Sequence, residues 1–167
     1  MNVAVHQTSH RYECTSIQDA VIAILQDIDA DNLISPGDDI VLKPNWVKEH
    51  DERHPGPDQW EHIVTHPGLI EAVADYVSDK LTGTGSITIC DAPQTDSCFP
   101  KLREYCRLDD IVERLTRKYP GTSIKLLDLR PEEWHAMDGV VVDKIQLEGD
   151  PAGATHVKLN EASEFVG

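Results

Sequence analysis

The sequence is short of cations. Its 167 residues include 15 lysines and arginines against 30 aspartates and glutamates, which gives a formal net charge of −15 at pH 7. Nucleic acids and anionic membrane surfaces are bound through clustered cations, so this composition argues against both kinds of partner. Solvated helix faces explain the acidic excess without any special function.

Long apolar runs and secretion signals are also missing. No stretch approaches the roughly 18 apolar residues of a membrane-spanning helix, and no basic segment followed by an apolar core opens the chain. The four cysteines contain no C-x-x-C pair, which disfavours a zinc ribbon and a redox motif. We therefore expect a cytoplasmic protein with reduced thiols.

Several familiar motifs are absent as well: the Walker A sequence, G-x-G-x-x-G and G-x-S-x-G. Gly83-Thr84-Gly85 follows a predicted helix instead of a strand, so it indicates a turn and not a dinucleotide loop. The length favours a single α/β domain over residues 1–167.

Strand-like and helix-like segments alternate along the chain. β-branched apolar runs bounded by turn residues indicate strands, and apolar residues at helical spacing indicate helices. This alternation predicts an open, mostly parallel β-sheet with helices on both faces, in Rossmann-like layering. The segment around residues 132–138 is polar and carries no strand or helix signal. The predicted strands are residues 2–6, 39–43, 86–90, 123–129 and 140–147, and the predicted helices are residues 17–28, 69–81 and 108–118.

Polar side chains follow two of these predicted strands, residues 39–43 and residues 86–90. Pro44 cannot donate to a sheet ladder, so the strand before it should end at about Lys43. In open α/β sheets ligands bind beyond the carboxyl ends of the strands, where both polar segments should meet. Such side chains suit an anionic or polyhydroxylated metabolite, or a divalent metal ion held through oxygen. The alternative is a pair of ordinary polar loops. The candidate ligand-binding residues are Lys43, Asn45, Trp46, His66, Asp91, Gln94 and Asp96.

The polar segment that follows the first of these strand ends is rich in histidine. His50, His54, His62 and His66 are candidate ligands of a transition metal. Their spacing lacks the H-E-x-x-H order of a zinc protease. An exposed, acidic, flexible loop from residue 47 to about residue 61, with the segment that follows it, explains His50, His54 and His62 without metal. His66 stands at the start of a predicted helix. There it would either line the proposed ligand site at the carboxyl ends of the strands or cap the helix.

Short motifs spread over nearly the whole chain resemble the Domain of Unknown Function 362 family, above all its members among bacterial polysaccharide-biosynthesis genes. The resemblance implies an α/β fold. Its polar motif residues fall on Lys43, Asn45, His66, Asp91 and Gln94. The motifs are residues 41–47 (VLKPNWV), 65–67 (THP), 72–76 (AVADY), 90–94 (CDAPQ), 127–130 (LDLR), 149–153 (GDPAG) and 163–165 (SEF).

Members of this family usually run on well past the position of Gly167, and some carry ferredoxin-like cysteine clusters that this sequence lacks. We therefore expect the N-terminal half of a longer family domain, present as a fragment, a split gene product or a reduced member. An edge strand at residues 140–147 would then be covered in a homo-oligomer or by a partner chain.

Three functions remain open at this point. The first is an enzyme, or half of one, acting on an anionic or sugar-related metabolite in polysaccharide biosynthesis. The second is a non-catalytic binding or assembly module that needs a partner. The third is a metal-dependent redox protein, suggested by the histidines and by the ferredoxin-bearing relatives.

Overall fold

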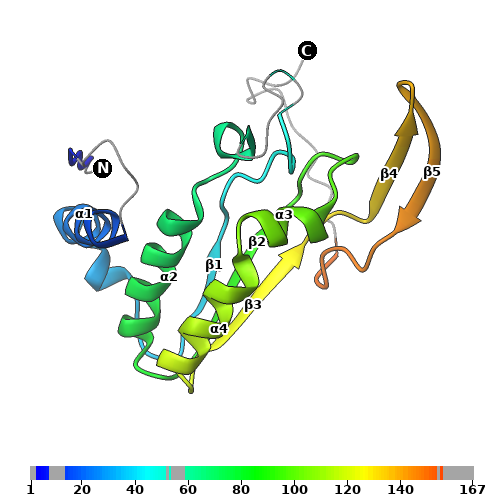
Figure 1. The fold of residues 1–167 in the computed structure, drawn as a ribbon. Coiled ribbons are helices and arrows are strands. Elements are labelled where there is room, and N and C mark those ends of the chain that lie inside the picture. The colour runs from blue at the N-terminus through cyan, green and yellow to red at the C-terminus, as the bar shows by residue number, and fades with distance from the viewer. Residues whose placement is uncertain (1–2, 8–13, 52, 54–58, 154, 156–167) are drawn as a thin grey trace, which may run out of the picture.

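The computed structural model describes residues 3–7, 14–51, 53, 59–153 and 155, and Figure 1 shows their arrangement. A 3-stranded sheet and a separate 2-stranded sheet accompany the helices, so the fold is mixed α/β. The strands are β1 (Asp39–Leu42), β2 (Ser86–Asp91), β3 (Ser123–Asp128), β4 (Glu132–Met137) and β5 (Val140–Gln146). The helices are α1 (Cys14–Asp27), α2 (Pro67–Leu81), α3 (Phe99–Tyr105) and α4 (Leu108–Lys118), with 3-10 turns η1 (Ala30–Leu33) and η2 (Gln59–His62).

The larger sheet has the order β1-β2-β3, and both pairings are parallel. Ile40 pairs with Ile87, and Ile87 pairs in turn with Ile124. Parallel neighbours require a crossover connection, which α2 supplies between β1 and β2 and α4 supplies between β2 and β3. The predicted neighbourhood of these strands is therefore confirmed.

Alternation along the strands divides the sheet into two faces. Ile87 and Ile89 are 0% exposed and belong to the main core, together with side chains of α2, α3 and α4. Val41 points to the opposite face and is 65% exposed. In Figure 1, α2, α3 and α4 all lie on one side of the sheet. Layering on both faces is thus not seen in the described part of the chain.

Helix α1 lies against α2 instead of against the sheet (Figure 1). Ile17 and Val21, both buried, pack on Ala72 of α2 in a small cluster separate from the main core. Their spacing of four residues places them on one face of α1, as the helical periodicity predicted. Among the described residues, no helix is long and apolar enough to cross a membrane.

Two predictions about strands are wrong. Residues 3–7 form no strand, and Val3 and Val5 are 83% and 87% exposed; residue 2 lies outside the described part of the chain. The polar segment 132–138, for which no strand was predicted, contains strand β4. Because β-propensity reflects packing against neighbours more than an intrinsic backbone preference, three apolar residues without a partner strand do not form one.

The predicted strand at residues 140–147 is confirmed as β5, but it pairs antiparallel with β4 and not with the parallel sheet. All seven residues of β5 are exposed. In Figure 1 the β4–β5 hairpin projects from the rest of the molecule. An isolated two-stranded hairpin is only marginally stable in water, so its attachment to the body matters.

Backbone segments pack closely at the amino ends of the parallel strands. A Cβ atom on Gly121 would lie 2.0 Å from the carbonyl oxygen of Gly83, and one on Gly85 would lie 2.3 Å from that of Asp38. Neither position has room for a side chain. These contacts bring the turns before β2 and β3 together and set where both strands begin.

Candidate functional site

The segments that follow the three parallel strands meet at the carboxyl edge of the sheet. Asp91 and Asp128, the last residues of β2 and β3, are paired in register. The backbone N–H of Gln94 donates to the carbonyl oxygen of Val47 at 2.9 Å, which joins the loop after β2 to the loop after β1. The expectation that the first two polar segments share one edge is therefore confirmed.

Asp91 is the buried centre of this edge, with 6% exposure. One carboxylate oxygen accepts the backbone N–H of Trp46 at 2.7 Å. The other lies 2.9 Å from Nζ of Lys43, whose side chain is 66% exposed. A hydrogen bond to a charged group stabilises a fold by about 1.5–3 kcal/mol, so Asp91 fixes the loop after β1 while it orients Lys43.

Trp46 does not line the crevice, although it was a candidate ligand-binding residue. Its side chain is 0% exposed and packs against Phe99, with ring centroids 5.6 Å apart. The indole N–H has no hydrogen-bond partner among the described residues. The side chain therefore fills the core beneath the crevice, and the residue contributes to the site through its backbone.

Asn45 and His66 are connected through Thr65. The backbone N–H of Asn45 donates to Oγ1 of Thr65 at 2.8 Å, and its carbonyl oxygen accepts the Thr65 N–H at 2.8 Å. The Asn45 side chain itself is exposed. Nδ1 of His66 accepts the N–H of Gly68 at 3.1 Å, so His66 caps α2. Burial lowers the pKa of His66, against a smaller opposing effect of Glu61.

The loop after β1 contains buried charges that the sequence did not predict. Lys48, Glu49 and Asp51 are each 7% exposed, although residues 47–61 were expected to form an exposed loop. Glu49 accepts the hydroxyl of Ser97 at 2.9 Å and the backbone N–H of Cys98 at 3.0 Å. Charged side chains are rarely this buried unless they are paired, so this part of the loop is a fixed wall.

Two ion pairs extend that wall. Nζ of Lys48 lies 2.6 Å from Asp96, and this hydrogen bond holds the pKa of Asp96 below its ordinary 3.8, while burial acts in the opposite direction. Asp51 accepts the backbone N–H of Arg53 at 2.9 Å, and the Arg53 guanidinium lies 3.8 Å from the same carboxylate. The Arg53 side chain is 86% exposed, so it can reach a ligand.

Arg130 is a further buried charge at this edge, with 3% exposure. Its guanidinium donates to Asp128 at 2.6 Å and lies 3.2 Å from Glu133. It also donates to the carbonyl oxygens of Gln94 at 2.7 Å and Ser97 at 2.8 Å. Arg130 thereby clamps the loop after β2 to the segment that joins β3 and β4.

These contacts surround an open polar cleft of about 380 Å³, a volume typical of small-molecule sites. Donors and acceptors converge in it: the Arg53 side chain, His50 with a 52% exposed side chain, and Asp96 with 42%. Such a mixture suits a ligand that carries negative charge and hydroxyl groups. The cleft is lined by Val47, Lys48, His50, Asp51, Arg53, Ile63, Gln94 and Asp96.

The candidate metal ligands are not gathered into a centre. Among the described residues, no group of three or more His, Cys, Asp and Glu side chains could hold a metal ion. Nδ1 of His50 lies 3.4 Å from Glu49, His62 is exposed, and His66 caps α2. His54 lies outside the described residues. The residues that the structure places here therefore do not fit a transition-metal site.

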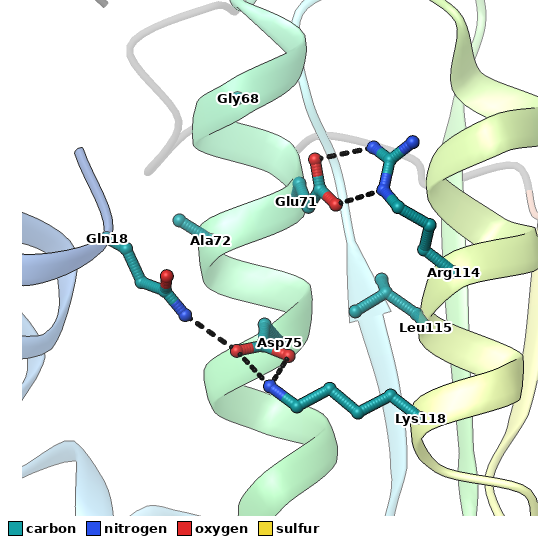
Figure 2. Close-up of a pocket in the computed structure, with 8 residues that line it drawn as sticks. All are labelled: Gln18, Gly68, Glu71, Ala72, Asp75, Arg114, Leu115 and Lys118. Carbon is teal, nitrogen blue, oxygen red and sulfur yellow. Dashed lines mark hydrogen bonds and ion pairs between the residues drawn. The ribbon is translucent and has the colours of Figure 1, made fainter. Parts of the chain in front are cut away.

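A larger groove of about 410 Å³ lies on the helical layer, between α1, α2 and α4 (Figure 2). Glu71 accepts two hydrogen bonds of 2.8 Å from Arg114. Asp75 accepts from Lys118 at 2.7 Å and from Gln18 at 2.8 Å. Each carboxylate in Figure 2 thus faces a cation of the neighbouring helix, and an incoming anion would have to break these pairs. We interpret the groove as a helix-packing contact.

Sequence reasoning located the edge but missed the residues that build its walls. The sequence did contain a signal for the wall in the loop after β1, because three charged residues fall within Lys48–Asp51, immediately after the candidate residues Asn45 and Trp46. No local pattern indicates that they are buried. Arg130 belongs to a motif of the family resemblance. Its role as a clamp, however, depends on distant carbonyl groups, such as that of Gln94, which is 36 positions away in the sequence.

No family model, no curated protein and no solved structure matches this chain.

Proposed function

We propose that the cleft between the loops 47–53 and 94–96 binds a small anionic, polyhydroxylated metabolite. The observation that carries this proposal is the burial of Lys48, Glu49 and Asp51 at 7% exposure each. Desolvating three charges is costly, and it is compensated only by specific pairing. A loop that merely connects β1 to α2 has no need of such charges, whereas a binding wall needs rigid, preorganised polar groups.

The exposed groups of the cleft would divide the recognition. The guanidinium of Arg53 offers a planar fork to a phosphate or carboxylate. Asp96 and the exposed amide of Gln94 offer acceptors and donors to hydroxyl groups. Because Lys48 neutralises Asp96 at 2.6 Å, the carboxylate does not repel an anion as strongly as the net charge of the chain suggests. The charge of the groups that line the cleft, more than the net charge of the chain, decides whether an anion binds there.

The resemblance to the Domain of Unknown Function 362 family favours a sugar-related metabolite, and with it an enzyme or part of an enzyme in polysaccharide biosynthesis. Membership of this family is itself a proposal. Lys43 and Asp91, which fall on motif positions of that family, form an ion pair of 2.9 Å, but Lys43 lines a separate hollow with Pro44 and Thr65 and not this cleft.

Native mass spectrometry of protein purified without chelators would report bound metabolites and metal directly. Titration with glucose 6-phosphate then tests the site in calorimetry. Arg53→Ala should weaken binding about tenfold or more, as expected for a charged hydrogen bond of about 1.5–3 kcal/mol. Arg117→Ala is the matched control, because that arginine is similarly exposed, at 73%, on the distant end of α4. Equal affinities of the two variants would refute the proposal.

The β4–β5 hairpin favours a second candidate, a binding or assembly module. Met137, Val140 and Val142 are 67%, 66% and 57% exposed on a hairpin that lies apart from the main core. An exposed apolar edge is a template for pairing with another chain. We propose a second copy of this chain, or a partner chain that completes the sheet, as the molecule that covers β5.

A further inference from the structure

A second open groove adjoins the polar cleft. Its volume is about 500 Å³, and it lies between the β4–β5 hairpin and the loop after β2. Gln94 and Asp96 line both hollows, so the loop 94–96 is their common wall. The groove is lined by Gln94, Thr95, Asp96, Trp134, Ala136, Gly139 and Val141.

Trp134 is the aromatic wall of this groove, and several contacts hold it in place. Its backbone N–H donates to the carbonyl oxygen of Thr95 at 2.7 Å, which fastens β4 to the loop. The indole N–H donates to Glu132. Nζ of Lys144 lies 4.2 Å from the ring centroid. The ring is therefore oriented before any ligand arrives, and its side chain is only partly buried.

The two hollows together present three kinds of surface in a fixed order. An aromatic ring, Trp134, lies on one side of the loop 94–96. The loop itself carries the exposed amide of Gln94 and the carboxylate of Asp96. The cations Arg53 and Lys48, with His50, lie on the other side. Ring, hydroxyl-binding groups and cations follow one another along the cleft.

We propose that the joined cleft and groove bind a nucleoside phosphate, with the base on Trp134, the ribose hydroxyls on Gln94 and Asp96, and the phosphate on Arg53. This inference rests on the proposed function and names its ligand. Aromatic side chains stack on bases of any sequence, carboxylates accept ribose hydroxyls, and guanidinium groups bind phosphate in a bidentate manner. The order of groups in a nucleoside phosphate is the order of surfaces in the protein.

The side chain of Arg53 is the main phosphate-binding group in this site. The sequence contains no glycine-rich phosphate loop, so backbone N–H groups of such a loop do not contribute. Lys48 is engaged with Asp96 at 2.6 Å, which leaves the exposed Arg53 as the main cation for the ligand. Binding should therefore weaken as the salt concentration rises.

The test compares AMP, UMP, ribose 5-phosphate and inorganic phosphate by calorimetry on the whole chain. AMP should bind about tenfold or more tightly than ribose 5-phosphate, which is the advantage that base stacking supplies. Trp134→Ala should remove that advantage and leave the affinity for ribose 5-phosphate unchanged. Trp134→Phe, which keeps an aromatic face, should retain most of it. Met137→Ala is the control for disturbance of the hairpin, since Met137 is exposed at 67% and does not line the groove.

Each outcome separates the two proposals. Equal affinities for AMP and ribose 5-phosphate, both sensitive to Arg53→Ala, would overturn the nucleoside inference and leave the proposed function standing. An AMP advantage that survives Trp134→Ala would also overturn it, because the base would then bind elsewhere. Failure of all four probes to bind would overturn the nucleoside inference, and failure of glucose 6-phosphate as well would overturn both. If Trp134→Ala unfolds the hairpin, the comparison of Trp134→Phe with Met137→Ala decides between stacking and structure.

Discussion

Replacing Arg130 by Met should be among the most destabilising single changes at the carboxyl edge of the sheet. The side chain is 3% exposed and pairs with Asp128 at 2.6 Å and Glu133 at 3.2 Å. Methionine keeps much of the volume but leaves both carboxylates without their cation. It also removes the donor to the carbonyl oxygens of Gln94 and Ser97.

Removal of one partner from a buried ion pair costs about 3–5 kcal/mol. A protein of this size has a total stability of about 5–15 kcal/mol. One kcal/mol shifts the melting temperature by about 2–4 °C at this length, so we expect a fall of about 6–20 °C. Urea unfolding followed by circular dichroism gives the free energy, and hydrogen exchange of residues 94–97 shows whether the loss is local.

Arg117→Met provides the control. Arg117 is 73% exposed and pairs with Glu113 one helical turn away, an arrangement worth about 0.3–0.5 kcal/mol. Adding Asp128→Asn and Glu133→Gln to Arg130→Met should recover part of the loss, because no buried charge then lacks a partner. A cost of Arg130→Met within about 1 kcal/mol of the control, with unchanged exchange in residues 94–97, would refute the clamp.

Four further outcomes are expected. His66→Ala should cost about 1 kcal/mol near neutral pH and His66→Asn almost nothing, because Asn also caps helices. Burial lowers the pKa of His66, so the stability that its neutral ring contributes is complete above the ordinary pKa of 6.5 and is lost as the pH falls from there to the lowered folded-state pKa. The urea midpoints of wild type and His66→Ala should therefore converge on acidification. Parallel curves of urea midpoint against pH would contradict the cap. Asn45→Ala should change stability by less than about 0.5 kcal/mol, because the turn is held by its backbone, and should leave the affinity for glucose 6-phosphate unchanged, because Asn45 does not line the cleft; a lower melting temperature would show that its side chain holds the turn. Gly121→Ala should cost about 1–3 kcal/mol in thermal melts, since its Cβ would lie 2.0 Å from a carbonyl oxygen; an unchanged melting temperature would contradict the close packing. In light scattering, the wild type should form a dimer or larger assembly that Val142→Lys dissociates, whereas a strictly monomeric wild type at high concentration would argue against an interface at β5.

The elements that could be predicted are those with a local signal. Runs such as Ile87–Ile89 are apolar and β-branched, and they are buried strands because both ladder neighbours are present. Pro67 marked the start of α2, where its missing N–H costs nothing. The parallel order of β1, β2 and β3 follows from the crossover rule once helices separate the strands.

The elements that could not be predicted depend on distant partners. Glu49 is buried because Ser97, 48 positions away, donates to it. Strand β4 exists because β5 pairs with it, although its own residues form a polar segment without a strand signal. Val3 and Val5 have the composition of a strand but no edge to pair with, and they remain exposed. Periodicity reports which face of an element could be buried, and only the fold decides whether a partner is there.

The hairpin and the cleft form one coupled unit through the loop 94–96. Arg130 binds the carbonyl oxygen of Gln94 on one side and Glu133 of β4 on the other, and Trp134 donates to Thr95. A two-stranded hairpin has little stability of its own, so these contacts decide how long it stays folded. A ligand that contacts Trp134 and Gln94 together must stabilise the hairpin, because it binds only the folded arrangement. By the same linkage, a molecule that covers β5 without entering the groove at Gly139 and Val141 should raise the affinity for the ligand, so association and ligand binding should be measured on the same samples.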